Sequence, residues 1–218
     1  MDMISIRRNL MAKIRQSGGG RLPAEYQEVE FLQSAGAQCI DTGFSGRSGY
    51  SAWYSISFDR ITTTLQQVFA STSTGDQRLY FPYAESNGCW AYAYRTVKNT
   101  SDAVVASQKY SVFAKLINSE QTVMIDGNVI ASGTVSTSIA NGTNLYLFAA
   151  NATNRRYSYA KIYDFRLYDH TEERYVANYV PCYRKADGKP GMYDLTTDSF
   201  FVNRNTGADF TVGPDVNY

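Results

Sequence analysis

One short segment of this 218-residue chain, Cys89-Trp-Ala-Tyr-Ala-Tyr-Arg95, alternates aromatic with small residues. In an extended strand its three rings project from one face and its small residues from the other. Flat rings stack on the apolar C–H face of a sugar, and neighbouring polar groups then fix the orientation of the sugar. The pattern predicts a carbohydrate-binding surface, and the candidate residues are Trp53, Tyr83, Trp90, Tyr92, Tyr94 and Arg95.

The same alternation has a second interpretation. Bulky rings are the ordinary filling of a β-sandwich core, so the interior is the favoured place for Trp90, Tyr92 and Tyr94, and surface exposure is the alternative. Trp53 differs because it stands on the serine side of the segment Tyr50-Ser-Ala-Trp-Tyr-Ser-Ile-Ser-Phe58. We therefore expect Trp53 to be the more exposed of the two tryptophans.

The sequence offers no recognisable catalytic constellation. Glycoside hydrolysis needs two carboxyl groups about 5–9 Å apart, and Asp164 and Glu172-Glu173 show no such arrangement. The single histidine, His170, is placed in a loop with no serine or cysteine nucleophile nearby. We expect a protein that is not an enzyme and that has no catalytic residues.

Metal and disulfide chemistry are equally weakly indicated. The three cysteines, Cys39, Cys89 and Cys182, lie far apart without the paired spacing of a zinc site, so we expect small buried thiols. Calcium would need several oxygen ligands. The aspartates that could contribute show no ligand spacing and are expected to be turn residues: Asp41, Asp76, Asp126, Asp187 and Asp209.

From Glu28 onward apolar and polar residues alternate between turn clusters, which is typical of an all-β sandwich. In Tyr159–Tyr168 we expect Tyr163, Phe165 and Leu167 to share the core side of a strand. Asp126-Gly127 predicts the tip of a hairpin. Pro181 is expected at an edge or a strand start.

Three segments resemble laminin-G-like, concanavalin A-like jelly-roll domains of bacteriophage and gut-bacterial proteins. They are Glu30–Phe44, Val123–Ile130 and Val180–Asn203, so the resemblance covers about residues 22–216. It implies a two-sheet antiparallel jelly-roll sandwich. Members that hydrolyse glycans carry a strand of the form Glu-x-Asp-x-x-Glu, and this chain has none.

Residues 1–22 form a basic arm, and we place the domain at residues 23–218. The arm carries a net charge of +4, which leaves −3 on the remainder and argues against nucleic-acid binding by the domain. Its apolar residues recur at helical spacing before the linker Ser17–Gly20. We expect a partner-docking helix formed by Ile4, Ile6, Arg7, Arg8, Leu10, Met11, Ile14 and Arg15. A membrane-surface helix, a nucleic-acid tail and an untethered tail stay open.

Together these features predict a non-enzymatic virion protein that binds cell-surface carbohydrate and is anchored by its arm to other virion proteins, in several copies. The start of the chain lacks the apolar core of a secretory signal, and no run reaches transmembrane length. A purely structural capsid or tail protein, and placement on a bacterial cell surface, are the alternatives.

Overall fold

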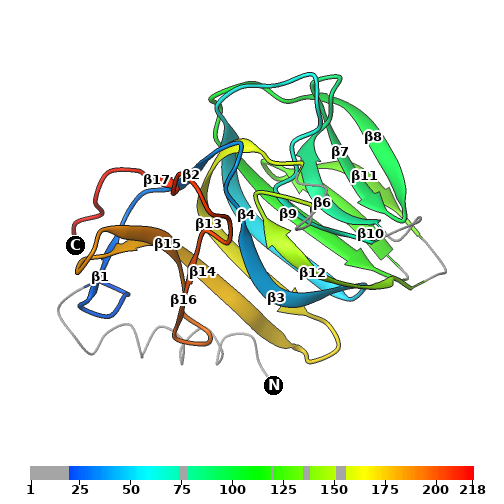
Figure 1. The fold of residues 1–218 in the computed structure, drawn as a ribbon. Coiled ribbons are helices and arrows are strands. Elements are labelled where there is room, and N and C mark those ends of the chain that lie inside the picture. Colours follow the sequence, from blue (N-terminus) through cyan, green and yellow to red (C-terminus); the bar gives the residue numbers. More distant parts are fainter. Residues whose placement is uncertain (1–19, 74–77, 119, 135–137, 151–155) are drawn as a thin grey trace.

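The computed structural model describes residues 20–73, 78–118, 120–134, 138–150 and 156–218. Within these ranges the strands form two antiparallel sheets that lie face to face (Figure 1), and no helix occurs. No helix long and apolar enough to cross a membrane is found in this part of the chain. The predicted all-β, two-sheet jelly-roll sandwich is confirmed, whereas the boundary at residue 22 stays a prediction.

One sheet has eleven strands and the other has six. The main path of the larger sheet runs β11 (Asn128–Gly133), β10 (Glu120–Ile125), β9 (Tyr110–Ile117), β4 (Tyr50–Phe58), β13 (Tyr159–Asp169), β14 (Arg174–Arg184), β15 (Lys189–Asp194), β16 (Ser199–Val202). Its shorter additions are β1 (Tyr26–Glu28), β2 (Leu32–Ala35) and β17 (Thr211–Val212). The smaller sheet runs β3 (Ile40–Arg47), β12 (Ala140–Leu147), β5 (Phe69–Thr72), β6 (Arg78–Ala84), β7 (Cys89–Tyr94), β8 (Thr96–Ala103).

Aromatic rings fill the space between the sheets. Phe165 on β13 stacks on Tyr54 of β4 at 5.9 Å between ring centroids and on Tyr179 of β14 at 5.7 Å. Phe69, from the opposite sheet, meets Phe165 edge to face at 4.7 Å. These rings are fully buried, so they remove a large apolar area from water and stabilise the contact between the two sheets.

The predicted hairpin joins β10 to β11. Asp126 and Gly127 both have positive φ, 50° and 80°, as the tight turns of antiparallel hairpins require. The Asp126 Oδ1 atom also accepts a hydrogen bond of 2.7 Å from the Ser111 amide on β9. The turn is therefore held to the neighbouring strand as well as to its own.

The side of the sheet predicted for Tyr163 is wrong. Phe165 and Leu167 are buried as expected, but a bulge lies between Ile162 and Asp164 in the pairing of β13 with β4. The extra residue shifts the alternation, so the Tyr163 hydroxyl meets Ser57 Oγ at 3.2 Å on the outer face.

The position predicted for Pro181 is also wrong, because it lies inside β14. On one side β14 pairs with β13 through Tyr179, and then with β1 from Cys182 onward. Pro181 stands where the partner changes; its carbonyl accepts a hydrogen bond from Val29 N. A proline fits this junction because it has no N–H group to pair.

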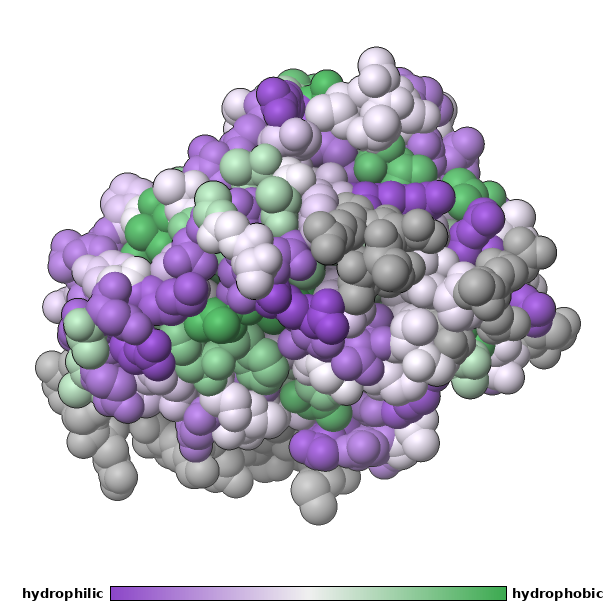
Figure 2. Space-filling model, viewed as in Figure 1, coloured by the Kyte–Doolittle hydropathy of each residue, from purple (hydrophilic) through white to green (hydrophobic). Residues whose placement is uncertain are grey.

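Figure 2 shows how apolar side chains are distributed on one face of the molecule. In the view of Figure 2, hydrophobic side chains lie in several separate patches among hydrophilic ones. The large hydrophobic residues that the structure describes as most exposed are Val105, Val129, Tyr175, Val212 and Tyr218.

The close approach of β15 and β16 can be tested at Gly191. A Cβ atom there would lie 2.2 Å from the Phe201 carbonyl oxygen and 2.8 Å from the Phe200 ring. We expect Gly191→Ala to lower the free energy of unfolding by about 1–3 kcal/mol in urea denaturation, because backbone cannot yield easily. Gly133→Ala is the matched control, since no atom lies within 4 Å of its Cβ position. Equal stability of the two variants would contradict the close packing.

Candidate functional site

The rings of β7 lie inside the sandwich, which corrects their assignment as ligand-binding residues. Trp90, Tyr92 and Tyr94 are all buried. Trp90 packs edge to face on Tyr110 of β9 at 5.2 Å and on Phe58 of β4 at 5.8 Å. Both partners belong to the opposite sheet, so these rings fill the core and no surface ligand reaches them.

Tyr83 lies on the other face of the six-stranded sheet. It pairs with Ala91, and directly opposed residues project from the same face. Its buried hydroxyl donates a hydrogen bond of 2.8 Å to Glu85 Oε2, and burial followed by this carboxylate raises the pKa of Tyr83. Glu85 in turn lines a rim cleft of about 550 Å³ with Thr63, Thr64, Leu65, Ser86, Arg156 and Tyr157.

Arg95 does not join either group. It forms the tight turn between β7 and β8 with a φ of 64°, and its amide donates to the Arg78 carbonyl at 2.7 Å. Its contribution is therefore a turn conformation that few residues adopt. The six predicted ligand-binding residues therefore do not form one site. Trp53 is the one among them that belongs to an aromatic surface.

Trp53 lies on the outer face of the eleven-stranded sheet with rings from three other strands. Its ring centroid is 4.9 Å from Phe113 on β9 and 5.8 Å from Tyr175 on β14. Tyr175, 39% exposed, lies 5.4 Å from Tyr168 on β13. We call Trp53, Phe113, Tyr168 and Tyr175 the aromatic face.

Strand pairing produces this face. Trp53 is directly opposite Phe113 on one side and Arg166 on the other. Arg166 is exposed and, among the described residues, forms no salt bridge. The face therefore combines rings in tilted and edge-to-face contact with a guanidinium group that has five N–H donors.

His170 extends the face and corrects its assignment as a histidine without a nearby serine. Its ring lies 5.0 Å from Tyr168, and Nε2 is 2.8 Å from Ser51 Oγ. The pairing of β4 with β13 brings together these residues, which are 119 positions apart in sequence.

The Ser51–His170 pair lacks features of a catalytic dyad. Ser51 is 1% exposed, and the Asp169 carboxylate is bound by Arg47 and the Thr171 amide. Among the described residues, no carboxylate is hydrogen-bonded to His170. Burial, followed by the nearby Lys115 ammonium, lowers the pKa of His170 despite the opposing charges of Asp169 and Glu120.

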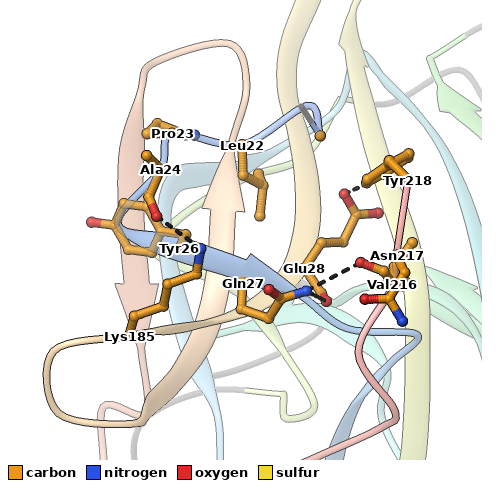
Figure 3. Close-up of a pocket in the computed structure, with 11 residues that line it drawn as sticks. Leu22, Pro23, Ala24, Tyr26, Gln27, Glu28, Lys185, Val216, Asn217 and Tyr218 are labelled. Carbon is orange, nitrogen blue, oxygen red and sulfur yellow. Dashed lines mark hydrogen bonds between the residues drawn. The ribbon is translucent and has the colours of Figure 1, made fainter. Parts of the chain in front are cut away.

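A larger cavity of about 660 Å³ lies at the opposite end of the sheet (Figure 3), and its charged groups already have partners. Glu28 accepts hydrogen bonds from Arg21 and from the Tyr218 hydroxyl at 2.6 Å. Lys185 donates to the Ala24 carbonyl at 2.9 Å. These contacts join the start of the described chain to Lys185 and Tyr218, so the residues around the cavity hold distant segments together. This structural role explains the cavity better than binding of a polar ligand does.

No group of three or more His, Cys, Asp and Glu side chains able to hold a metal occurs in the part of the chain described. Asp41, Asp126, Asp187 and Asp209 each have their own protein partners. Asp76 lies outside the described residues, as do all the predicted docking residues from Ile4 to Arg15. No disulfide bond joins the three cysteines, all of which lie in the described ranges; Cys39 and Cys182 are buried as expected, whereas Cys89 is half-buried. Burial raises the pKa of Cys182 to about 12.

Comparison with solved structures gives the same fold. A Bacteroides ovatus protein proposed to bind carbohydrate matches 88% of this chain and 62% of its own, with 11% identity and a TM-score of 0.59. A heptameric SAP-like pentraxin from Limulus polyphemus matches 88% of this chain and 97% of its own, with 12% identity and a TM-score of 0.54. At these identities the likenesses show the β-sandwich fold that this chain shares with both proteins.

Other matches are partial. Trypanosoma rangeli sialidase matches 56% of this chain at 15% identity with a TM-score of 0.46, and this chain spans 20% of the sialidase. No protein-family model and no curated protein sequence matches the chain.

The site residues predicted from the sequence include Trp53 but not Phe113, Tyr168 and Tyr175. The alternation in Tyr110–Ile117 places Phe113 opposite the buried Val112 and Ala114, so an outward ring was detectable there. The order of strands β9, β4, β13 and β14 was not detectable, because it depends on pairing between distant segments.

The lowered pKa of His170 predicts a pH-dependent stability. The unfolded chain takes up this proton first, so stability is present above the usual pKa of 6.5 and falls as pH drops below it. We expect urea unfolding of the wild type to lose more stability between pH 7.5 and 5.5 than that of His170→Gln. Because this is the single histidine, NMR titration of its ring reads the pKa directly. A measured pKa above 6.5 would contradict the environment described.

Proposed function

We propose that this protein is a non-enzymatic carbohydrate-binding β-sandwich and that the aromatic face around Trp53 is its ligand-binding surface. The observation that carries the proposal is the placement of Trp53 and Phe113, with ring centroids 4.9 Å apart, beside Arg166, whose guanidinium forms no salt bridge with any residue that the structure describes. Rings supply area for the apolar face of a sugar, and a guanidinium supplies directed donors for its hydroxyl groups.

The likeness to the Bacteroides ovatus protein supports carbohydrate as the ligand class, at the level of fold. The chemistry of the face gives independent support, because tryptophan, tyrosine and arginine dominate the energetic centres of recognition surfaces. The Ser51–His170 pair gives little support to hydrolysis, since the serine is buried.

We further propose that the sandwich is displayed on a virus particle in several copies and binds glycans of the host-cell surface. The laminin-G-like segments, of a kind found in bacteriophage proteins, support this placement. The basic, periodic arm of residues 1–20 supports anchoring to another virion protein, which would fold the arm on binding.

A glycan array with the intact protein tests the ligand. We expect binding that Trp53→Ala weakens by about tenfold or more, because losing a central aromatic anchor costs on the order of 2 kcal/mol. Tyr183→Ala, at a half-buried tyrosine on β14, is the matched control and should keep wild-type binding. Absence of binding to any glycan or host cell, even for multimerised protein, would instead favour a purely structural accessory role.

Deletion of residues 1–20 tests the anchor separately. We expect loss of incorporation into particles with sugar binding retained, because the aromatic face belongs to the sandwich. A variant with the arm sequence scrambled but its charge kept distinguishes a docking helix from a merely basic tail. Normal incorporation of the deletion variant would rule out the arm as the anchor.

A further inference from the structure

The aromatic face is the middle of a longer row of side chains. Directly opposed residues of an antiparallel pair share a face. Following these pairs across six neighbouring strands gives the row Val129, Met124, Phe113, Trp53, Arg166 and Asn178. Five steps between strands of about 4.8 Å give it a length of about 24 Å.

The row is apolar at one end and polar at the other. Four apolar side chains from β11, β10, β9 and β4 come first, and an arginine and an asparagine from β13 and β14 follow. Val129 is 59% exposed, and Phe113 and Trp53 are half-buried. The apolar part thus begins at the sheet edge formed by β11 and reaches the centre of the sheet.

Polar side chains border the row on both sides. One flanking row contains Thr122, Lys115, Tyr168 and Tyr175; Ser51 stands between Lys115 and Tyr168 in the same row, but it is buried and its hydroxyl contacts His170. The other contains Ser111, Ser55 and Asp164. An apolar line between hydroxyl, ammonium and carboxylate groups matches a ligand with apolar faces and polar edges.

We propose that this row binds several consecutive sugars of an extended glycan chain that crosses the strands, which rests on the proposed function. Apolar sugar faces lie on Phe113 and Trp53, and hydroxyl groups along the chain meet the flanking rows. A ligand with polar edges suits the row better than a wholly apolar one, because an apolar ligand would remove flanking polar groups such as Asp164 from water without replacing their hydrogen bonds. Since the row reaches the sheet edge at β11, the glycan continues past it, and the site accepts internal stretches of a chain.

Calorimetry with oligosaccharides of one to six units tests this mode. The probes are cello-, malto- and manno-oligosaccharides, together with size-fractionated fragments of any polysaccharide that the glycan array selects. We expect affinity to rise several-fold with each added sugar up to four or five units and then to level off, because the row has that length. Equal affinity for one and six units would overturn the extended mode and leave carbohydrate binding intact. Absence of binding by every probe would overturn both.

Variants at the end of the row separate it from a single-sugar site. Val129→Ser should weaken binding of the hexasaccharide several-fold and leave the disaccharide unchanged. Val105→Ser is the matched control, because Val105 is 53% exposed and lies outside the row. Loss of disaccharide and hexasaccharide binding to the same extent, or no effect on either, would overturn the role of the row.

Discussion

The antiparallel register between β4 and β13 is the constraint on which the two faces of the larger sheet depend. Tyr54 opposite Phe165 gives a stacked pair inside the sandwich, and Trp53 opposite Arg166 gives the centre of the outer face. A slip of one residue would exchange the faces and expose the buried rings. The apolar interior therefore fixes the outer face as well, since both belong to the same strands.

The bulge at Tyr163 is part of this register. It absorbs one residue between Ile162 and Asp164, so both halves of β13 keep an apolar side toward the core. The displaced ring lies beneath Lys109, whose ammonium is 4.0 Å from the ring centroid, and beside Phe31. A cation over a ring is attracted by the negative face of the π system, so the bulge also shapes the outer surface.

The cavity near Glu28 and the outer face of the larger sheet differ in how many polar groups they leave available to a ligand. In the cavity near Glu28, the carboxylate is already paired with Arg21 and Lys185 already donates to the Ala24 carbonyl, which stabilises the chain but leaves few free polar groups for a ligand. The outer face instead presents Arg166 without an ion pair among the residues described. Its rings stand on paired strands and contact one another, so binding a ligand would cost little conformational entropy.

The sequence by itself determined the fold class, the hairpin at Asp126-Gly127 and the exposure of Trp53 relative to Trp90. Each of these depends on local alternation or turn chemistry, which a strand carries in its own residues. Tertiary structure alone decided that Trp90, Tyr92 and Tyr94 face the core, because alternation shows that two faces differ and not which one meets the opposite sheet. It also decided that Phe113, Tyr175 and His170 lie beside Trp53 and its strand. Their contacts join β9, β4, β13 and β14. The order of these strands depends on hydrogen bonds between segments distant in sequence, and the residues of a single strand do not show which other strand it pairs with.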